Sequence, residues 1–184
     1  MSTRPDINRG RVARFDIAGA VFILILGGAL HFAFEWSNSF PFVAPFAAVN
    51  ESVWEHLKLA FWPALVWAFI EFRPMNGTVN NFLLAKGLSI VLMPLLIIAL
   101  FYGYTALLGD NILALDIGTF VVSVFLCQWL SYRLLTSDER SPASNLSAAM
   151  LVVVFSILLV IFTFVTPHIG LFQDGPSGMY GILR

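Results

Sequence analysis

Histidines and carboxylates recur at helical spacing in two short stretches of an otherwise apolar chain. His31 and Glu35 are four residues apart, as are Glu51 and Glu55, and His56 follows directly. Residues four apart lie on one face of a helix, so each stretch can offer two groups to the same ion. Imidazoles and carboxylates are ordinary ligands of zinc, iron and manganese. The spacing therefore predicts a site for a divalent metal ion.

The expected site assigns a role to each group. The predicted metal ligands are His31, Glu35, Glu55, His56 and His168. His56 lies about 100° round a helix from Glu55. It can therefore bind the same ion as the other ligands only if the first turn is distorted. Otherwise it can support one of the ligands without binding the ion itself. Glu51 and Glu55 are the predicted catalytic groups, because a metal activates water and a glutamate not bound to it can accept the proton. The expected substrate is a lipid-like or small apolar molecule.

The same glutamates also have a purely structural interpretation. Ser52 and Glu55 match a capping box, in which each side chain bonds a free amide at a helix start. Alternatively, Asn50 is the N-cap, and Glu51 lies favourably at the positive end of the helix dipole. The sequence leaves these interpretations open.

Two of the histidines have structural interpretations as well. His31 and Glu35 could share a hydrogen bond within one helix, and His168, which follows Pro167, could simply be solvated. A helix cap explains neither His31 nor Glu35, so this pair favours a site. Ionisable groups at the edge of hydrocarbon are costly and tend to mark functional positions.

Composition places the chain in a membrane. The 184 residues are 59% hydrophobic and 11% charged, against a usual charged share of roughly 25%. A soluble domain of this size could not bury so much apolar surface, so membrane lipids are the expected surroundings. A net charge of −1 indicates no nucleic-acid partner, and the single Cys127 rules out an internal disulfide framework.

Five apolar stretches are long enough to cross a bilayer as helices. They cover residues 15–34, 53–72, 82–107, 112–135 and 146–166. Short links rich in Pro, Gly, Asn or Ser join them. The sequence therefore predicts an all-α polytopic bundle of five transmembrane helices, forming a single integral membrane domain over residues 1–184. The first stretch is too long for a cleaved signal and is read as a retained anchor.

The basic residues predict the orientation. With the N-terminus inside, eight of them face the cytoplasm, and two, Lys58 and Arg184, face the other side. The eight are Arg4, Arg9, Arg11, Arg14, Arg73, Lys86, Arg133 and Arg140. Five crossings place the C-terminus outside, and all three histidines at the outer end. In the inner half we expect Glu71 to pair with Arg73, and we expect no continuing polar path.

A resemblance agrees with this architecture. The run from His31 to Trp36, followed by the run from Asn50 to Lys58, resembles the signature of a family of small bacterial multi-pass membrane proteins catalogued only as a domain of unknown function. The resemblance covers most of the chain. It implies a five-helix protein of the bacterial inner membrane and carries no mechanism with it.

Three classes of function fit these observations. The first is a metal-dependent membrane enzyme with the site described above. The second is a carrier or channel for protons or metal ions, with Pro63 and Pro94 as gating kinks. The third is a structural or assembly subunit whose polar groups hold helices together. The sequence leaves open a homo-oligomer and does not name the substrate.

Overall fold

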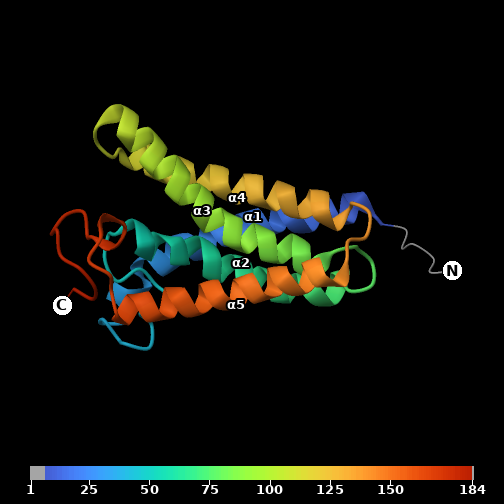
Figure 1. Cartoon of the computed structure of the whole chain (residues 1–184), viewed down its shortest axis with the longest axis horizontal. Coiled ribbons are helices and arrows are strands. Elements are labelled where there is room, and N and C mark those ends of the chain that lie inside the picture. The colour runs from blue at the N-terminus through green and yellow to red at the C-terminus, as the bar shows by residue number, and fades with distance from the viewer. Residues whose placement is uncertain (1–6, 184) are drawn as a thin grey trace.

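The computed structural model describes residues 7–183, and in this range five α-helices run alternately in opposite directions (Figure 1). They are α1 (Arg9–Trp36), α2 (Val53–Met75), α3 (Phe82–Leu108), α4 (Leu113–Leu135) and α5 (Pro142–Phe164). A short 3₁₀ turn, η1, follows at Gly170–Phe172. The predicted all-α class and the five helices are confirmed, and the predicted bounds differ by a few residues at most ends.

Capping residues explain where the helices begin and end. The Asn8 side chain accepts a hydrogen bond from the Arg11 amide at 2.9 Å, so α1 starts six residues before the apolar run that predicted it. Ser141 caps α5 and is followed by Pro142, whose fixed φ suits the first helical position. At the end of α3, Gly109 adopts φ +81°, a left-handed conformation that glycine tolerates.

The helices pack closely where small residues meet. α1 lies against α2 and α4, and α3 lies against α2, α4 and α5. At Gly27 of α1, an added Cβ would stand 2.5 Å from the carbonyl oxygen of Leu59 on α2. At Gly87 of α3, it would stand 2.8 Å from the carbonyl oxygen of Ala148 on α5. These glycines let neighbouring backbones approach, as is common in membrane helices.

Four helices, α1, α3, α4 and α5, are long and apolar enough to cross a membrane. Large apolar side chains cover the outside of the bundle, among them Phe69, Leu107 and Leu113, which are at least 73% exposed. A surface of this kind needs a lipid environment and indicates a membrane protein. The remaining helix, α2, carries charged side chains, most of which are buried inside the bundle.

Two segments outside the α-helices, residues 37–52 and residues 165–183 with η1, cover one end of the bundle. They are tied together, since the Asn50 side chain donates to the Gly181 carbonyl at 2.8 Å. Trp54, in the first turn of α2, packs on Phe172 of η1 with ring centroids 4.7 Å apart. The C-terminal residues therefore fold back over this end of the bundle, where the histidines also lie.

The opposite half of the bundle contains a buried charged cluster that corrects one prediction. Glu71 of α2 does not rely on Arg73, which is exposed. Instead it pairs with Lys86 of α3, and Lys86 also pairs with Asp16 of α1. The predicted pairing of Glu71 with Arg73 is therefore wrong, because Asp16, Glu71 and Lys86 come from three helices that sequence spacing could not bring together.

Candidate functional site

His31 reaches the site from the last turns of α1. One turn earlier, Gly27 lets α1 touch the α2 backbone at Leu59. The same helix face therefore carries the His31 imidazole towards the start of α2. The His31 side chain is 30% exposed, so it lies at the edge of the bundle interior and is only partly buried.

Glu51 lies just before α2, in the segment that closes the bundle end. The helix starts after Ser52, whose side chain accepts from the Glu55 amide at 3.3 Å. The Glu51 backbone amide donates to the Asp174 carboxylate at 2.8 Å. The C-terminal segment therefore holds the Glu51 backbone in place, while its side chain remains 51% exposed.

His56 projects from the first turn of α2. Its Nδ1 lies 2.8 Å from the Ser52 carbonyl oxygen, which can only accept, so Nδ1 carries the proton. In a neutral imidazole, the lone pair then belongs to Nε2. A histidine that ligates a metal is commonly oriented in this way, by a hydrogen bond from its other ring nitrogen.

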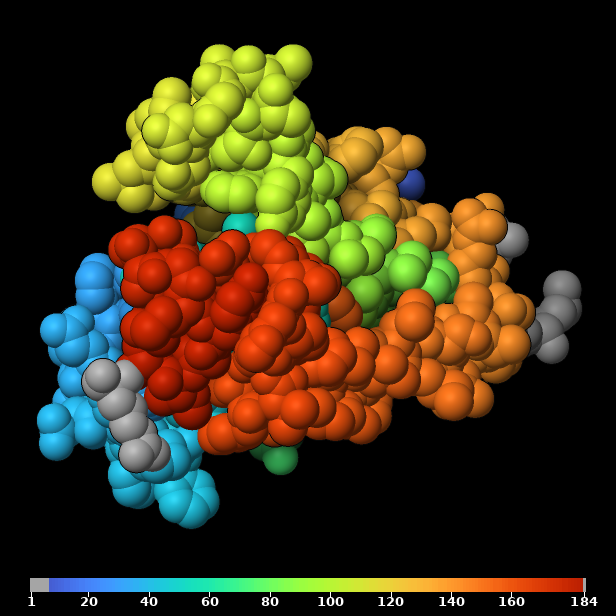
Figure 2. All heavy atoms as spheres, turned by 60° about the vertical axis from the view of Figure 1, so that its left-hand side comes forward, coloured from blue at the N-terminus to red at the C-terminus, as the bar shows by residue number. Residues whose placement is uncertain are grey.

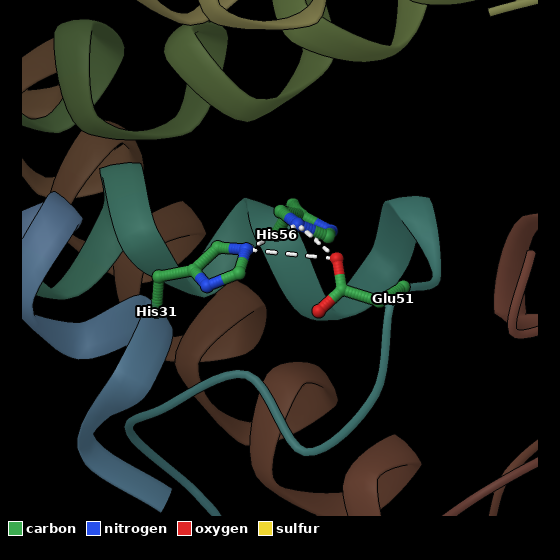
Figure 3. A group of neighbouring side chains, drawn as sticks. All are labelled: His31, Glu51 and His56. Atoms are coloured by element: carbon green, nitrogen blue, oxygen red, sulfur yellow. Dashed lines mark hydrogen bonds and ion pairs between the residues drawn. The ribbon is translucent and has the colours of Figure 1, made fainter. Parts of the chain in front are cut away.

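The three side chains converge on one point (Figure 3). The Nε2 atoms of His31 and His56 are 3.2 Å apart. The Glu51 Oε2 atom lies 3.3 Å from Nε2 of His56 and 3.6 Å from Nε2 of His31. We call His31, Glu51 and His56 the outer triad. Within residues 7–183, it is the group of histidine, cysteine and carboxylate side chains arranged to hold a metal ion.

The outer triad is electrostatically prepared for a cation. Hydrogen bonding to His31 and His56 holds the pKa of the Glu51 carboxyl well below its usual range, although partial burial opposes this shift. The carboxylate is therefore ionised at neutral pH. A cation among the three groups would accept the lone pairs of Glu51 Oε2 and of both Nε2 atoms, in place of the hydrogen bonds that otherwise join the three side chains.

The separations within the outer triad fit tetrahedral coordination. Ligand atoms about 2.0–2.1 Å from a tetrahedral zinc ion lie about 3.3–3.4 Å from each other. The observed separations of 3.2, 3.3 and 3.6 Å bracket this value. The geometry therefore leaves room for one ion among the three atoms, with a fourth coordination position free.

A cavity of about 1290 Å³ adjoins the outer triad. It lies between the α3–α4 turn and the C-terminal segment, where Figure 2 shows a recess in the surface. Its lining includes all three members of the outer triad, and most of its surface is apolar. Apolar contributors include Leu24, Ile97, Phe101, Ile117 and Phe120. The cavity is large enough for an apolar molecule of substantial size. The triad forms one polar part of its lining, and Asn111, Asp116 and Asp174 also line it.

The structure directs Glu55 away from the outer triad. Its carboxylate forms an ion pair with Lys58 and accepts a hydrogen bond from the Val49 amide at 3.1 Å. Lys58 is fully buried and also donates to the Ala44 carbonyl at 2.7 Å. Glu55 and its neighbour His56 diverge because they are about 100° apart on the helix. Glu55 therefore joins helices to the 37–52 segment, in place of the predicted ligand role.

Two other predicted ligands also lie apart from the group. Glu35 is exposed, one turn beyond His31 and close to the end of α1. His168 packs against Tyr180, with ring centroids 4.7 Å apart and the rings tilted by 38°, in the C-terminal segment. Neither belongs to the metal-competent group among the described residues.

Sequence reasoning underestimated Glu51 as a ligand and missed Asp174 altogether. We expected Glu51 and Glu55 to share a helix face, but Glu51 precedes the N-cap, so helical spacing does not apply to it. The signal for this was present, because Ser52 matched a capping box. No sequence pattern links Asp174 to Glu51, which are 123 residues apart.

The model of one protein family, described as a family of unknown function (DUF6512), matches residues 7–182. This match agrees with the predicted resemblance to a family known as a domain of unknown function. No curated protein and no solved structure matches the chain. The function must therefore be argued from the geometry of the site itself.

Proposed function

We propose that this chain, which belongs to the DUF6512 family of unknown function, binds a divalent metal ion through the outer triad and acts with it on a lipid-like molecule. The observation that carries the proposal is the convergence of three ligand atoms, 3.2–3.6 Å apart, from two separate stretches of chain. Two imidazoles and one carboxylate with a free fourth position are typical of catalytic zinc, whereas structural zinc has four protein ligands.

The residues of the site, the metal ion and the cavity have separate roles in this proposal. His56 is oriented by its Nδ1 bond to the Ser52 carbonyl, and Asp174 holds the Glu51 backbone. A divalent ion in such a site polarises a substrate carbonyl or phosphoryl oxygen and lowers the pKa of water towards about 7. The apolar lining of the cavity supports the substrate class, because it can hold a hydrocarbon tail while the polar part of the molecule reaches the triad.

Metal analysis of matched variants tests the proposal. Purified protein in mild detergent is expected to contain one zinc, iron or manganese ion per chain. His31→Ala and Glu51→Gln should lose it. His168→Ala and Glu35→Gln should retain it, since they remove the same residue types at the same end of the bundle. Protein without metal after incubation with each ion, or equal loss in the controls, would refute the site.

Neighbouring valines on α4 test the substrate class. Val121 lines the cavity, whereas Val122 does not line it and is 47% exposed on the surface. Val121→Trp should therefore block a fluorescent long-chain acyl probe from binding, and Val122→Trp should bind it as the wild type does. Equal binding by both variants would place the probe outside the cavity.

The proposed orientation places the outer triad on the extracytoplasmic side of the bacterial inner membrane, with α2 as a fifth crossing. Within residues 7–183, the six arginines lie towards the opposite ends of the helices, in keeping with a cytoplasmic N-terminus. Lys58 and Lys86 are buried in ion pairs, so neither acts as a loop charge. Arg4 and Arg184, which the prediction also counted, lie outside the described residues.

Ion transport is a second candidate function. The buried charged residues in the half of the bundle opposite the outer triad favour it. Asp16, Glu71 and Lys86 give the inner half the polar groups that a carrier would need. Flux assays in proteoliposomes separate the two functions. Transport of zinc or protons that depends on the outer triad would favour the carrier, and metal binding without flux would favour the enzyme.

A further inference from the structure

Three charged side chains from three helices meet in the half of the bundle opposite the outer triad. The Lys86 Nζ atom on α3 lies 2.9 Å from Oδ1 of Asp16 on α1 and 2.6 Å from Oε2 of Glu71 on α2. All three residues are at most 4% exposed. We call Asp16, Glu71 and Lys86 the inner cluster. It shares no residue with the metal site proposed above.

The other elements around the inner cluster supply polar groups but no balancing charge. From α4, Gln128 donates to the Asp16 backbone carbonyl at 3.2 Å, and the fully buried Ser131 hydroxyl faces the Asp16 carboxyl. Tyr132 of α4 also lines a small cavity beside Asp16. The whole of α5 contains no acidic, basic or tyrosine side chain.

The nearby arginines do not enter the inner cluster. Arg14 and Arg73 are exposed, although they belong to the helices of Asp16 and Glu71, and Arg133 of α4 is exposed as well. Arg133 lies over the Trp129 ring at 5.4 Å, and Arg14 donates to the Gly10 carbonyl at 3.3 Å. The inner cluster therefore has to balance its charge with its own three members.

That balance fails if every member is ionised. Two carboxylates and one ammonium leave a net charge of −1 inside a low-dielectric bundle, which costs several kcal/mol or more. In such a place a group usually becomes neutral in preference to remaining an unpaired ion. Several buried polar atoms here also lack a regular hydrogen bond within the described residues: Asp16 Oδ2, Glu71 Oε1 and Ser131 Oγ.

We propose that the inner cluster is a proton-binding site, which holds one proton between the carboxyls of Asp16 and Glu71 while Lys86 stays charged. The proton makes the cluster neutral and converts one carboxylate into a donor for the acceptors around it. A cavity of about 220 Å³ lies beside Asp16 between α1 and α4, and Gln128 and Tyr132 are among the residues that line it. Carboxyl groups buried within membrane helices serve pumps and transporters as proton-binding groups.

Infrared spectroscopy of the full chain in lipid nanodiscs tests this proposal. At neutral pH the wild type should show the carbonyl-stretch band of one protonated carboxyl, which shifts in heavy water. Asp16→Asn and Glu71→Gln should each abolish the band, because the remaining carboxylate and Lys86 already balance. Lys86→Met should roughly double it, because both carboxyls then need a proton.

A control and a check on folding keep the result decisive. Glu139 is exposed in the loop before α5, so Glu139→Gln should leave the band unchanged. Variants count only if they elute as a single species with wild-type helix content. Absence of the band in the wild type, or its survival in Asp16→Asn or Glu71→Gln, overturns the proposal. So does a stoichiometric sodium ion at the inner cluster in place of the proton. None of these outcomes bears on the metal site.

Discussion

The contact between α1 and α2 at Gly27 provides a test that links helix packing to the metal site. In Gly27→Ala the new Cβ would stand 2.5 Å from the Leu59 carbonyl oxygen and 2.9 Å from the Phe120 ring. Ordinary contact begins near 3.4 Å, so the two helices must separate by about 0.9 Å. Because the obstacle is backbone, no side-chain rotation relieves it, and we expect a loss of about 1–3 kcal/mol of stability.

The displacement should also reach the outer triad. His31 lies one turn beyond Gly27 and moves with α1, so its 3.2 Å separation from His56 would widen to about 4 Å. Sites of this kind need their ligands within about 0.5 Å of the productive geometry. We therefore expect zinc affinity to fall about 10- to 100-fold, as it does when groups that support metal ligands are removed.

Gly28 supplies the matched control on the same helix. An added Cβ there meets nothing within 4 Å, so Gly28→Ala should keep wild-type zinc affinity and thermal stability. Isothermal titration calorimetry with zinc, and thermal unfolding in the same detergent, measure both quantities. If the Gly27→Ala and Gly28→Ala variants behave alike in both assays, close helix packing does not position His31, and the reasoning fails.

Three further predictions follow from the same contacts. Zinc affinity should fall as the pH is lowered, because protons compete with the metal ion for the imidazole nitrogens, while Glu51 stays ionised since its pKa lies below its usual value. Calorimetry at several pH values measures this. Lys58→Met should lower the free energy of unfolding by about 3–5 kcal/mol, because it leaves the buried Glu55 carboxylate without its ion-pair partner. Adding Glu55→Gln should recover much of that loss, and thermal unfolding measures both variants. Asp174→Ala should weaken zinc binding about 10- to 100-fold, whereas Asp174→Asn, which keeps an acceptor for the Glu51 amide, should weaken it less.

Glu51 also gives the folding equilibrium a defined pH dependence. Its pKa is lowered in the folded chain, so its contribution to stability is fully present above its ordinary value of 4.5. This contribution is lost as the pH falls below that value. Glu51→Gln should therefore lower the stability in the neutral region and flatten the acid limb of the curve, so that the variant approaches the wild type at low pH. An unchanged acid limb would show that the histidines do not stabilise this carboxylate.

Much of the architecture could be predicted because membrane helices are encoded locally. An apolar run of about 20 residues forms a helix in lipid, whatever its neighbours are. Stripes of glycine identify the close-packed face, as at Gly19 and Gly27 of α1. The first residues of the helices were harder to predict, because a polar capping residue such as Asn8 lies outside the apolar run.

The membership of the site could be predicted only in part. Spacing of four residues placed Glu35 with His31 and Glu55 with Glu51, but a helix spacing rule fails once a residue lies outside the helix or beyond its packed region. Glu51 precedes the Ser52 cap, and Glu35 is exposed at the end of α1. The convergence of His31 with His56 depends on how α1 crosses α2.

The amino-acid sequence alone determined that the chain is a bundle of apolar helices with its histidines at one end. Composition and helical length decide this locally, through the cost of exposing peptide groups to lipid. Only the tertiary structure decided which ionisable groups meet. It brought His31 to His56 across 25 residues, and it joined Asp16 to Lys86 across 70 residues. Buried charges must find partners in three dimensions, and sequence spacing does not record those distances.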